Sequence, residues 1–259
     1  MFDVAEAYEA MMGRWSRQLA PLFVEFVGVR DGDNVLDVGC GTGSLSATLA
    51  RVTGVSKIVG IDPSSGFIEY ARTHIVDPRV TFEVGDAQAL SYSDDSFDRS
   101  MALLVVNFIP DAPKAVKEMR RVTRPGGVVA ITMWDGGRAH KLSSSLWDAA
   151  VAIDPTAKRP SERQGSYGSA EALFGLLKSA GLIKTEVTEL TMPCRFSSFD
   201  DYWLPATKGQ GPSGAYLARL SEDQRDRLRE RLRQNLFANR PEGPFSLKAK
   251  AWAVKGIVS

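Results

Sequence analysis

The stretch Val35-Leu36-Asp37-Val38-Gly39-Cys40-Gly41-Thr42-Gly43 decides the fold of this chain. Four strand-like residues run into a Gly-x-Gly-x-Gly turn, and the segment 44–50 that follows has a helical pattern. Glycine accepts positive φ angles, and its missing side chain lets a ligand approach the backbone. A strand, a glycine turn and a helix in this order open a nucleotide-binding βαβ unit. For the glycines alone, a tight turn without a ligand is the alternative.

Length and composition are those of an ordinary globular protein. The chain has 259 residues, 44% hydrophobic and 24% charged, which allows one α/β domain or a domain with a cap. The net charge of +1 gives no electrostatic reason to expect nucleic acid or an anionic membrane as the main partner. The two cysteines exclude a disulfide framework and favour a reducing compartment.

Neither a membrane segment nor a metal site is expected. No run of about 18 apolar residues occurs, and the acidic start, residues 1–6, lacks the pattern of a signal peptide. The only histidines are His74 and His140, and no Cys/His cluster accompanies them. We therefore expect a cytoplasmic protein without a metal.

The pattern after the glycine turn alternates between strands and helices. Strands are expected over 35–38, 56–62, 80–86, 97–106 and 128–134, with helices over 44–50, 63–74 and 112–122 and a break at 123–127. Ser64 or Ser65 is expected to cap the helix over 63–74. This alternation predicts a parallel sheet covered on both faces, in which ligands bind beyond the carboxyl ends of the strands. Asp62, Asp86 and Asp135 all fall at such ends.

The flanking segments are mainly helical. Residues 3–27 read as two helices around Gly13–Arg17, which either pack on the sheet edge or form a flap with Arg14 facing a carboxylate. Later helices are expected over 142–153, 170–180 and most of 196–237, with a break at 208–214, and strands over 182–190 and 245–258. The alternating arginines of 225–233 are expected to spread round a solvated exterior.

Two acids at successive strand ends limit the kinds of ligand that the site can bind. A carboxylate at Asp62 suits a ribose diol, and Asp86 with the N–H of Ala87 suits an adenine edge. Taken singly, Asp62 could be a helix cap and Asp86 a turn residue. A dinucleotide turn needs a third glycine where Ser44 stands, and Asp37 would repel a phosphate but suits a cationic group.

These residues resemble the motifs of the class I S-adenosylmethionine-dependent methyltransferases. The stretch 35–43 is similar to their first motif, and 60–64, 85–87 with 96–98, and 121–127 are similar to the later ones. Three further segments resemble a bacterial methyltransferase-type-11 subgroup, in which they flank and cap the site: Tyr8–Arg17, Phe199–Trp203 and Gly209–Pro212.

The resemblance implies an α/β fold with a Rossmann-like, seven-stranded, mostly parallel sheet, an antiparallel last strand and a helical cap. Residues 1–259 would form a single domain, with 1–30 as an N-terminal flap and 196–237 as a cap insertion. The implied cofactor is S-adenosyl-L-methionine, with S-adenosyl-L-homocysteine as the product. Together with Arg14 and Asp37 from the arguments above, the predicted cofactor-binding residues are Gly39, Cys40, Gly41, Asp62, Pro63, Phe67, Asp86, Ala87 and Leu103.

Methyl transfer from a sulfonium is an in-line displacement, so the protein mainly has to place the nucleophile about 3 Å from the methyl group and exclude water. A hydroxyl acceptor benefits from a general base, and the candidates are Asp135, His140, Tyr167 and Tyr8. Many relatives have histidine where Asn107 stands, so no histidine base is expected there. The candidate acceptor pocket comprises Trp15, Asn107, Trp134, Tyr202 and Trp203.

The interpretation is therefore a methyltransferase with a small-molecule acceptor, acting as a monomer or homodimer. Ser44 and Asp37 disfavour the alternative of a nicotinamide-dependent oxidoreductase. A non-catalytic S-adenosylmethionine-binding subunit stays open. The near-neutral charge and the lack of a basic tail disfavour a macromolecular acceptor.

Overall fold

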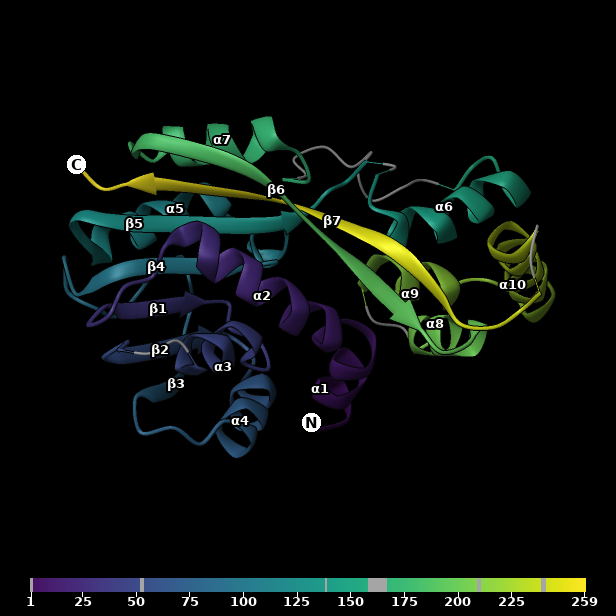
Figure 1. The fold of residues 1–259 in the computed structure, drawn as a ribbon, viewed down its shortest axis with the longest axis horizontal. Helices are drawn as coiled ribbons and strands as arrows, with labels where there is room; N and C mark the ends of the chain where they lie inside the picture. Colours follow the sequence, from purple (N-terminus) through teal and green to yellow (C-terminus); the bar gives the residue numbers. More distant parts are fainter. Residues whose placement is uncertain (1, 52–53, 138, 158–166, 209–210, 239–240) are drawn as a thin grey trace. The chain divides into compact units, whose positions relative to one another are not determined.

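The computed structural model describes residues 2–51, 54–137, 139–157, 167–208, 211–238 and 241–259. Within them, seven strands form one sheet in the order β3-β2-β1-β4-β5-β7-β6 (Figure 1). The first five strands pair in parallel, and β7 runs antiparallel to β5, which confirms the predicted fold class. The strands are β1 (Asn34–Val38), β2 (Lys57–Asp62), β3 (Val80–Val84), β4 (Phe97–Leu103), β5 (Thr123–Trp134), β6 (Ile183–Phe196) and β7 (Phe245–Ile257).

Helices connect and flank these strands. They are α1 (Phe2–Tyr8), a π-helical turn (Glu9–Gly13), α2 (Arg14–Val27), α3 (Ser44–Arg51), α4 (Ser65–His74), α5 (Ala112–Val122), α6 (Lys141–Ile153), α7 (Ala170–Ser179), α8 (Phe199–Ala206), α9 (Gly211–Leu217) and α10 (Glu222–Phe237). The serine cap predicted for the helix after β2 is confirmed, because Ser64 Oγ accepts from the Phe67 N–H. Ser221 and Gln224 form a capping box at the start of α10.

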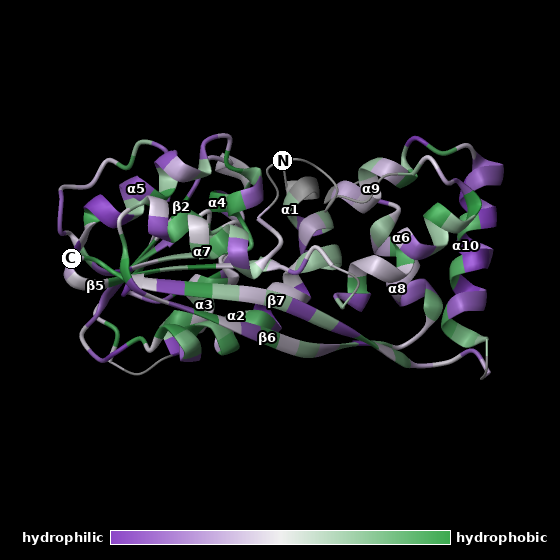
Figure 2. Cartoon of the chain, turned by 90° about the horizontal axis from the view of Figure 1, so that it is seen from above, coloured by the Kyte–Doolittle hydropathy of each residue, from purple (hydrophilic) through white to green (hydrophobic). Residues whose placement is uncertain are grey.

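The first five strands carry helices on both faces of the sheet (Figure 2). Successive residues of a strand point to opposite faces, so Leu36 and Val38 pack in an apolar cluster with α5 and α7. Val35 points to the opposite face and packs in a second apolar cluster, with α2 and α3. The central strand β1 is therefore buried on both sides, as its apolar sequence predicts.

The chain divides into two compact units. The first comprises residues 1–134, 167–190 and 251–259, and the second comprises 135–166 and 191–250. In the second unit, aromatic rings from three elements make the core: Phe196 stacks on Phe245 at 5.0 Å and meets Tyr202 edge-on at 5.1 Å. The prediction of one domain with a flap at 1–30 and a cap at 196–237 stays a prediction.

Several predicted boundaries were wrong. β4 ends at Leu103 and not at Val106, because Leu104 takes a left-handed φ of 62° and its N–H donates to the Thr132 carbonyl. β5 begins at Thr123 inside the predicted break, because Thr123 pairs with Phe97 of β4.

The predicted break at 208–214 is also shorter than expected, because α9 begins at Gly211. Gly209 and Gln210, which belong to one of the segments resembling the type 11 subgroup, lie outside the described residues.

The arginines of α10 do not all spread round the exterior as predicted. Arg225, Arg229 and Arg233 are four residues apart, so they share one helix face, and all three are half-buried. Arg229 pairs with Asp200 at 2.8 Å, and the Arg233 guanidinium lies 4.7 Å above the Phe199 ring. These arginines therefore pack within the second unit.

In the part of the chain that the structure describes, no helix has the length and apolar character needed to cross a membrane.

Candidate functional site

The glycine turn follows β1, and its three glycines are left-handed, with φ angles of 67° at Gly39, 54° at Gly41 and 89° at Gly43. Two of them are required by packing. A side chain at Gly39 would overlap Val105, and one at Gly43 would overlap Ile75 of the α4 end. Nothing lies within 4 Å of the position that a Cβ would take at Gly41. Gly41 therefore presents open backbone, which suits the close approach of a ligand.

Asp37 is fully buried at the end of β1. Its Oδ2 accepts from the N–H and the hydroxyl of Ser46 at 3.0 and 2.7 Å, which ties β1 to α3. Its Oδ1 is buried and has no partner among the described residues. Burial raises the pKa of Asp37 to about 7. A buried carboxylate oxygen without a donor suits a cationic group such as an ammonium.

Asp62 ends β2 beside the same turn and is 8% exposed. Its Oδ2 accepts from the Gly41 N–H at 3.0 Å, and its Oδ1 accepts from the Ser64 N–H at 2.9 Å. Burial raises its pKa above the ordinary value, and these two hydrogen bonds oppose that effect. Each oxygen keeps a further lone pair, which is the number that a ribose diol requires.

The N-terminal helical segment contacts the glycine turn and α4. The ring of Tyr8 lies 5.5 Å from the ring of Phe67, and the Tyr8 hydroxyl is 3.4 Å from the Ser16 hydroxyl. Glu9 accepts from the hydroxyl of Thr42, inside the glycine turn, and pairs with Arg17. The first unit thus brings the predicted residues Tyr8, Phe67 and Gly41 to neighbouring elements.

Two other predicted residues of this segment have different surroundings. The Arg14 guanidinium lies 4.2 Å above the Trp15 ring, and Trp15 is only 3% exposed. Trp15 is therefore part of the core around α2. The predicted roles of Arg14 toward the cofactor and of Trp15 toward the acceptor stay predictions.

Gly41 is flanked by a buried thiol. Cys40 is 7% exposed and packs with Ile68 and Ala71 of α4, while its backbone N–H donates to the Ile61 carbonyl at 2.8 Å. Burial raises the pKa of the Cys40 thiol well above its ordinary value, so the thiol stays protonated. Only the backbone of Cys40, and not its thiol, suits the predicted role of contacting the cofactor. Pro63, just past Asp62, is exposed.

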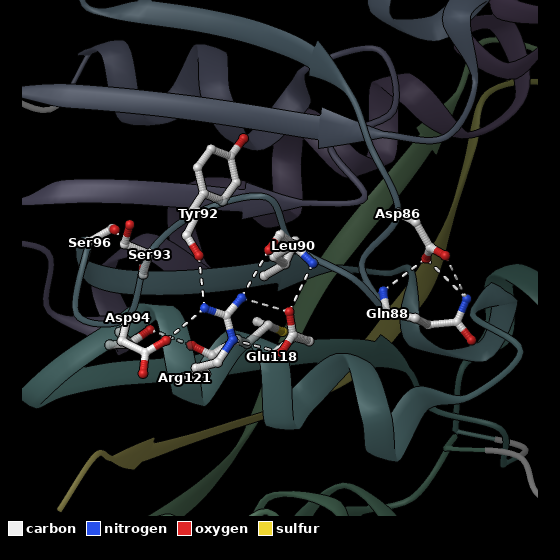
Figure 3. A network of polar contacts seen from close by, with 11 residues as sticks. Asp86, Gln88, Leu90, Tyr92, Ser93, Asp94, Ser96, Glu118 and Arg121 are labelled. Carbon is white, nitrogen blue, oxygen red and sulfur yellow. Dashed lines mark hydrogen bonds and ion pairs between the residues drawn. The ribbon is translucent and has the colours of Figure 1, made fainter.

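The loop after β3 carries the predicted adenine-reading pair. The Asp86 carboxylate is exposed and accepts from the backbone and side-chain N–H groups of Gln88 at 2.8 and 3.0 Å (Figure 3). These hydrogen bonds lower the pKa of Asp86, so it is ionised at neutral pH. Ala87 is 8% exposed, which fixes its backbone against the core.

Arg121 holds the rest of this loop in place (Figure 3). Its guanidinium donates to the carbonyls of Leu90 and Tyr92 at 2.9 and 2.8 Å and pairs with Glu118 and Asp94 at 2.8 Å. Glu118 in turn accepts from the Leu90 N–H at 2.9 Å. One side chain of α5 therefore fixes the course of the loop from Asp86 towards β4.

Leu103 is the last residue of β4, and Asn107 lies beyond it in a 3-10 turn (Val106–Phe108). Leu103 is half-buried and pairs with Thr132 of β5. The Asn107 side chain is exposed, and its Oδ1 accepts from the Tyr167 N–H at 2.8 Å. Asn107 therefore links the β4 end to the start of the segment before α7. Trp134, at the end of β5, is half-buried.

The base candidates differ in chemistry. Burial raises the pKa of Tyr8 and of Tyr167, so both phenols keep their protons at neutral pH. His140, in the second unit, is 4% exposed, and burial lowers its pKa to about 4. Its Nδ1 accepts from the Lys250 N–H at 3.1 Å, and the Asp135 N–H donates to the Lys250 carbonyl at 2.9 Å. His140 is thus neutral and tied to β7.

Tyr202 and Trp203 lie in α8 of the second unit. They are 8% and 4% exposed, and the Tyr202 hydroxyl donates to the Leu142 carbonyl at 3.1 Å. Trp203 stacks near Phe199 at 6.1 Å. Both rings belong to the aromatic core of that unit, and their assignment to an acceptor pocket stays a prediction.

The groups around the glycine turn fit S-adenosylmethionine. Open backbone at Gly41, the unpartnered Oδ1 of Asp37 and the remaining lone pairs of Asp62 are what a cationic aminoacyl group and a ribose require. A pyrophosphate would meet two buried carboxylates instead. Within the described residues, no group of three or more His, Cys, Asp or Glu side chains could hold a metal ion.

Sequence reasoning missed Glu9, Thr42 and Val105 as parts of this site. The Glu9–Thr42 hydrogen bond joins residues that are 33 positions apart in the sequence, and no local sequence pattern predicts it. Val105 fills the space that Gly39 leaves open, although its sequence neighbourhood reads only as the end of a strand.

Comparison with known proteins agrees with this geometry. Residues 36–131 match the family model of a methyltransferase domain. Methyltransferase GfsG of Streptomyces halstedii is 43% identical over 111 residues, which cover 41% of this chain and 40% of that protein. The 2-methyl-6-phytyl-1,4-hydroquinone methyltransferase of Synechocystis is 31% identical over 186 residues, 70% of this chain and 56% of that protein. The chain spans about half the length of the curated relatives it matches.

A solved structure extends the fold comparison to the whole chain. Phosphoethanolamine N-methyltransferase 2 of Haemonchus contortus, in complex with S-adenosyl-L-methionine, has a TM-score of 0.59 and 21% identity. The match covers 100% of this chain and 58% of that one. Residues 36–131 therefore carry a type 11 methyltransferase domain, and the strand order of the chain is that of the class I methyltransferase fold.

Proposed function

We propose that this protein is an S-adenosylmethionine-dependent methyltransferase with a small-molecule acceptor. The observation that carries the proposal is the junction of β1, the glycine turn and β2. There Asp37 and Asp62 border the backbone of Gly41. This backbone is open, because no atom lies within 4 Å of the position that a Cβ would take at Gly41. Two carboxylates beside open backbone suit a cationic adenosyl ligand and oppose a pyrophosphate.

Each residue of the site has a proposed task. Asp37 faces the ammonium of the methionine moiety, Asp62 accepts from the ribose hydroxyls, and the backbone of Gly39–Gly41 lies along the ligand. Asp86 and the Ala87 N–H read the adenine edge, and Pro63 and Phe67 lie beside it. When bound, S-adenosylmethionine supplies an activated methyl group. The protein then has to orient the acceptor in line with it and exclude water.

The acceptor is proposed to be small and apolar or aromatic. The Synechocystis relative is named for a hydroquinone, and another relative, from Symbiobacterium thermophilum, is named for demethylmenaquinone. The net charge of +1 offers no attraction for a nucleic acid. Within the first unit, the proposed pocket comprises Trp15, Asn107 and Trp134, and residues 1–30 are proposed as a flap.

General-base catalysis works best with a group whose pKa lies near the operating pH. His140 does not meet that condition, because a pKa lowered to about 4 makes it a weak base, and Tyr8 and Tyr167 hold their protons more tightly than free phenols. Phenols of this kind suit hydrogen-bond donation to the acceptor. Asp135 remains a further candidate.

Titration calorimetry tests the ligand, and a turnover assay tests the reaction. We expect S-adenosylmethionine and S-adenosylhomocysteine to bind with one-to-one stoichiometry and NADH not to bind. Binding of NADH alone would favour an oxidoreductase. Release of S-adenosylhomocysteine is then followed with a panel of hydroquinones, phenols and amines. Cofactor binding without turnover on any acceptor would favour a non-catalytic subunit, and gel filtration separates monomer from homodimer.

A further inference from the structure

Glu9 reaches the glycine turn from the first residue of the π-helical turn. Its carboxylate accepts from the hydroxyl of Thr42 and pairs with the guanidinium of Arg17. The Glu9 side chain is 12% exposed, whereas that of Arg17 is 48% exposed, and Thr42 is buried. A glutamate of the N-terminal segment thus lies against the cofactor-binding motif of the chain.

The π-helical turn and Gly13 allow this placement. π-Helical turns are rare and frequently occur at functional sites. A Cβ on Gly13 would lie only 2.5 Å from Oε1 of Glu9, so a side chain there would push the carboxylate away. Gly13 therefore leaves room for the Glu9 side chain to lie across the helical segment.

The groups that hold Glu9 are those that bind carboxylates in general. A guanidinium and a hydroxyl at a glycine turn donate charge-assisted hydrogen bonds to any carboxylate of suitable reach. The methionine moiety of the proposed cofactor carries such a carboxylate, next to the ammonium that Asp37 would face. The two carboxylates, one internal and one from the ligand, then need the same donors.

We propose that Glu9 is an internal competitor, which occupies in the ligand-free protein the donors that the cofactor's carboxylate takes over on binding. The inference rests on the proposed function. Binding exchanges one carboxylate for another on Thr42 and Arg17, so these donors stay paired before and after the exchange. Because the ligand has to displace Glu9, its net binding free energy is smaller, so binding is weaker and release is faster.

Two ligands separate this role from a general effect on the site. S-Adenosylhomocysteine has the amino acid group, and 5′-methylthioadenosine lacks it. Calorimetry on Glu9→Gln should show a Kd for S-adenosylhomocysteine about three- to fivefold lower than wild type, the size expected of a partly exposed ion pair. The Kd for 5′-methylthioadenosine should not change.

Gly13→Ala provides a steric route to the same result without altering charge, because the added methyl displaces the Glu9 carboxylate. It should lower the Kd for S-adenosylhomocysteine in the same way, and Thr42→Val should raise it. Glu6→Gln is the matched control, since Glu6 is exposed on α1. It should leave both ligands unaffected. Thermal unfolding without ligand checks that each variant is folded.

The results that would overturn the inference can be told apart from those that would refute the proposed function. A selective loss of S-adenosylhomocysteine affinity in Glu9→Gln would mean that Glu9 binds the ligand's ammonium, and would overturn the inference. Equal changes for both ligands, or no change, would also overturn it while leaving the proposed function intact. A wild-type protein that binds neither ligand would refute the proposed function, and the inference with it.

Discussion

Gly39 and Gly41 have similar backbone angles but different surroundings, so a pair of alanine substitutions can separate stability from binding. Either substitution places a non-glycine residue in the left-handed region, at φ 67° or 54°, which costs about 1–2 kcal/mol. At Gly39 the new methyl also lies 2.8 Å from the Cβ of Val105, whereas at Gly41 it meets no atom within 4 Å.

The overlap at Gly39 cannot be relieved by a flexible side chain, because Val105 is β-branched and its Cβ itself is too close. Overpacking of this kind costs about 1–3 kcal/mol. A difference of about 2 kcal/mol between the two variants corresponds to about 6 °C in Tm for a chain of this size. We therefore expect Gly39→Ala to unfold at a clearly lower temperature than Gly41→Ala in differential scanning calorimetry.

Binding should show the reverse order of sensitivity at temperatures where both variants are folded. A methyl at Gly41 enters the space proposed for the cofactor, so Gly41→Ala should weaken S-adenosylhomocysteine binding about tenfold, or about 1.4 kcal/mol. Equal Tm values for the two variants would refute the packing argument. Wild-type affinity in Gly41→Ala would refute the placement of the ligand.

Three further predictions concern charged groups. Asp62→Ala and Asp86→Ala should each weaken S-adenosylhomocysteine binding by about 1.5–3 kcal/mol in calorimetry, and unchanged affinity in both would exclude the proposed ribose and adenine contacts. Asp37 has a pKa raised from 3.8 to about 7, so its contribution to stability is present at low pH and is lost as the pH rises through 7. Asp37→Asn should therefore raise the Tm relative to wild type at pH 8.5 more than at pH 5, and a constant difference would contradict the shift. Arg99 and Asp33 form a buried pair, with side chains 7% and 9% exposed, so Arg99→Leu should cost about 3–5 kcal/mol in urea unfolding. Arg124→Leu, which breaks the more exposed pair with Asp98, should cost about 1 kcal/mol or less, and similar losses in the two variants would show that burial does not decide the effect.

The parts predicted correctly from the sequence are those with local causes. A strand running into closely spaced glycines gave β1 and its left-handed turn, and the acid at the end of β2 lies beside that turn as predicted. Ser64 caps α4 because a serine before a helix has a side chain of the right length.

The parts that escaped prediction depend on contacts between distant segments. Leu104 is left-handed although nothing in its side chain favours that conformation, and its N–H bonds to β5. Glu9 and Thr42 meet only because the N-terminal helical segment packs beside the glycine turn. One face of α10 is half-buried because its arginines, which recur at every fourth position, pair with residues distant in sequence: Arg229 with Asp200 and Arg233 with Glu242.

The position of β7 has a consequence for folding. β7 is the last strand in the sequence, yet it lies between β5 and β6, so β6 has no neighbour in the sheet until β7 has paired with β5. Among the parallel strands the longest separation in sequence is between β1 and β4, where Val35 pairs with Arg99, whereas Val128 of β5 pairs with Ile257 of β7 across an even longer stretch of chain. Contacts of such long sequence separation form slowly, since the chain entropy is lost first. The pairing of β7 with β5 should therefore be a late step, during which the apolar β5 edge is open to association with other chains.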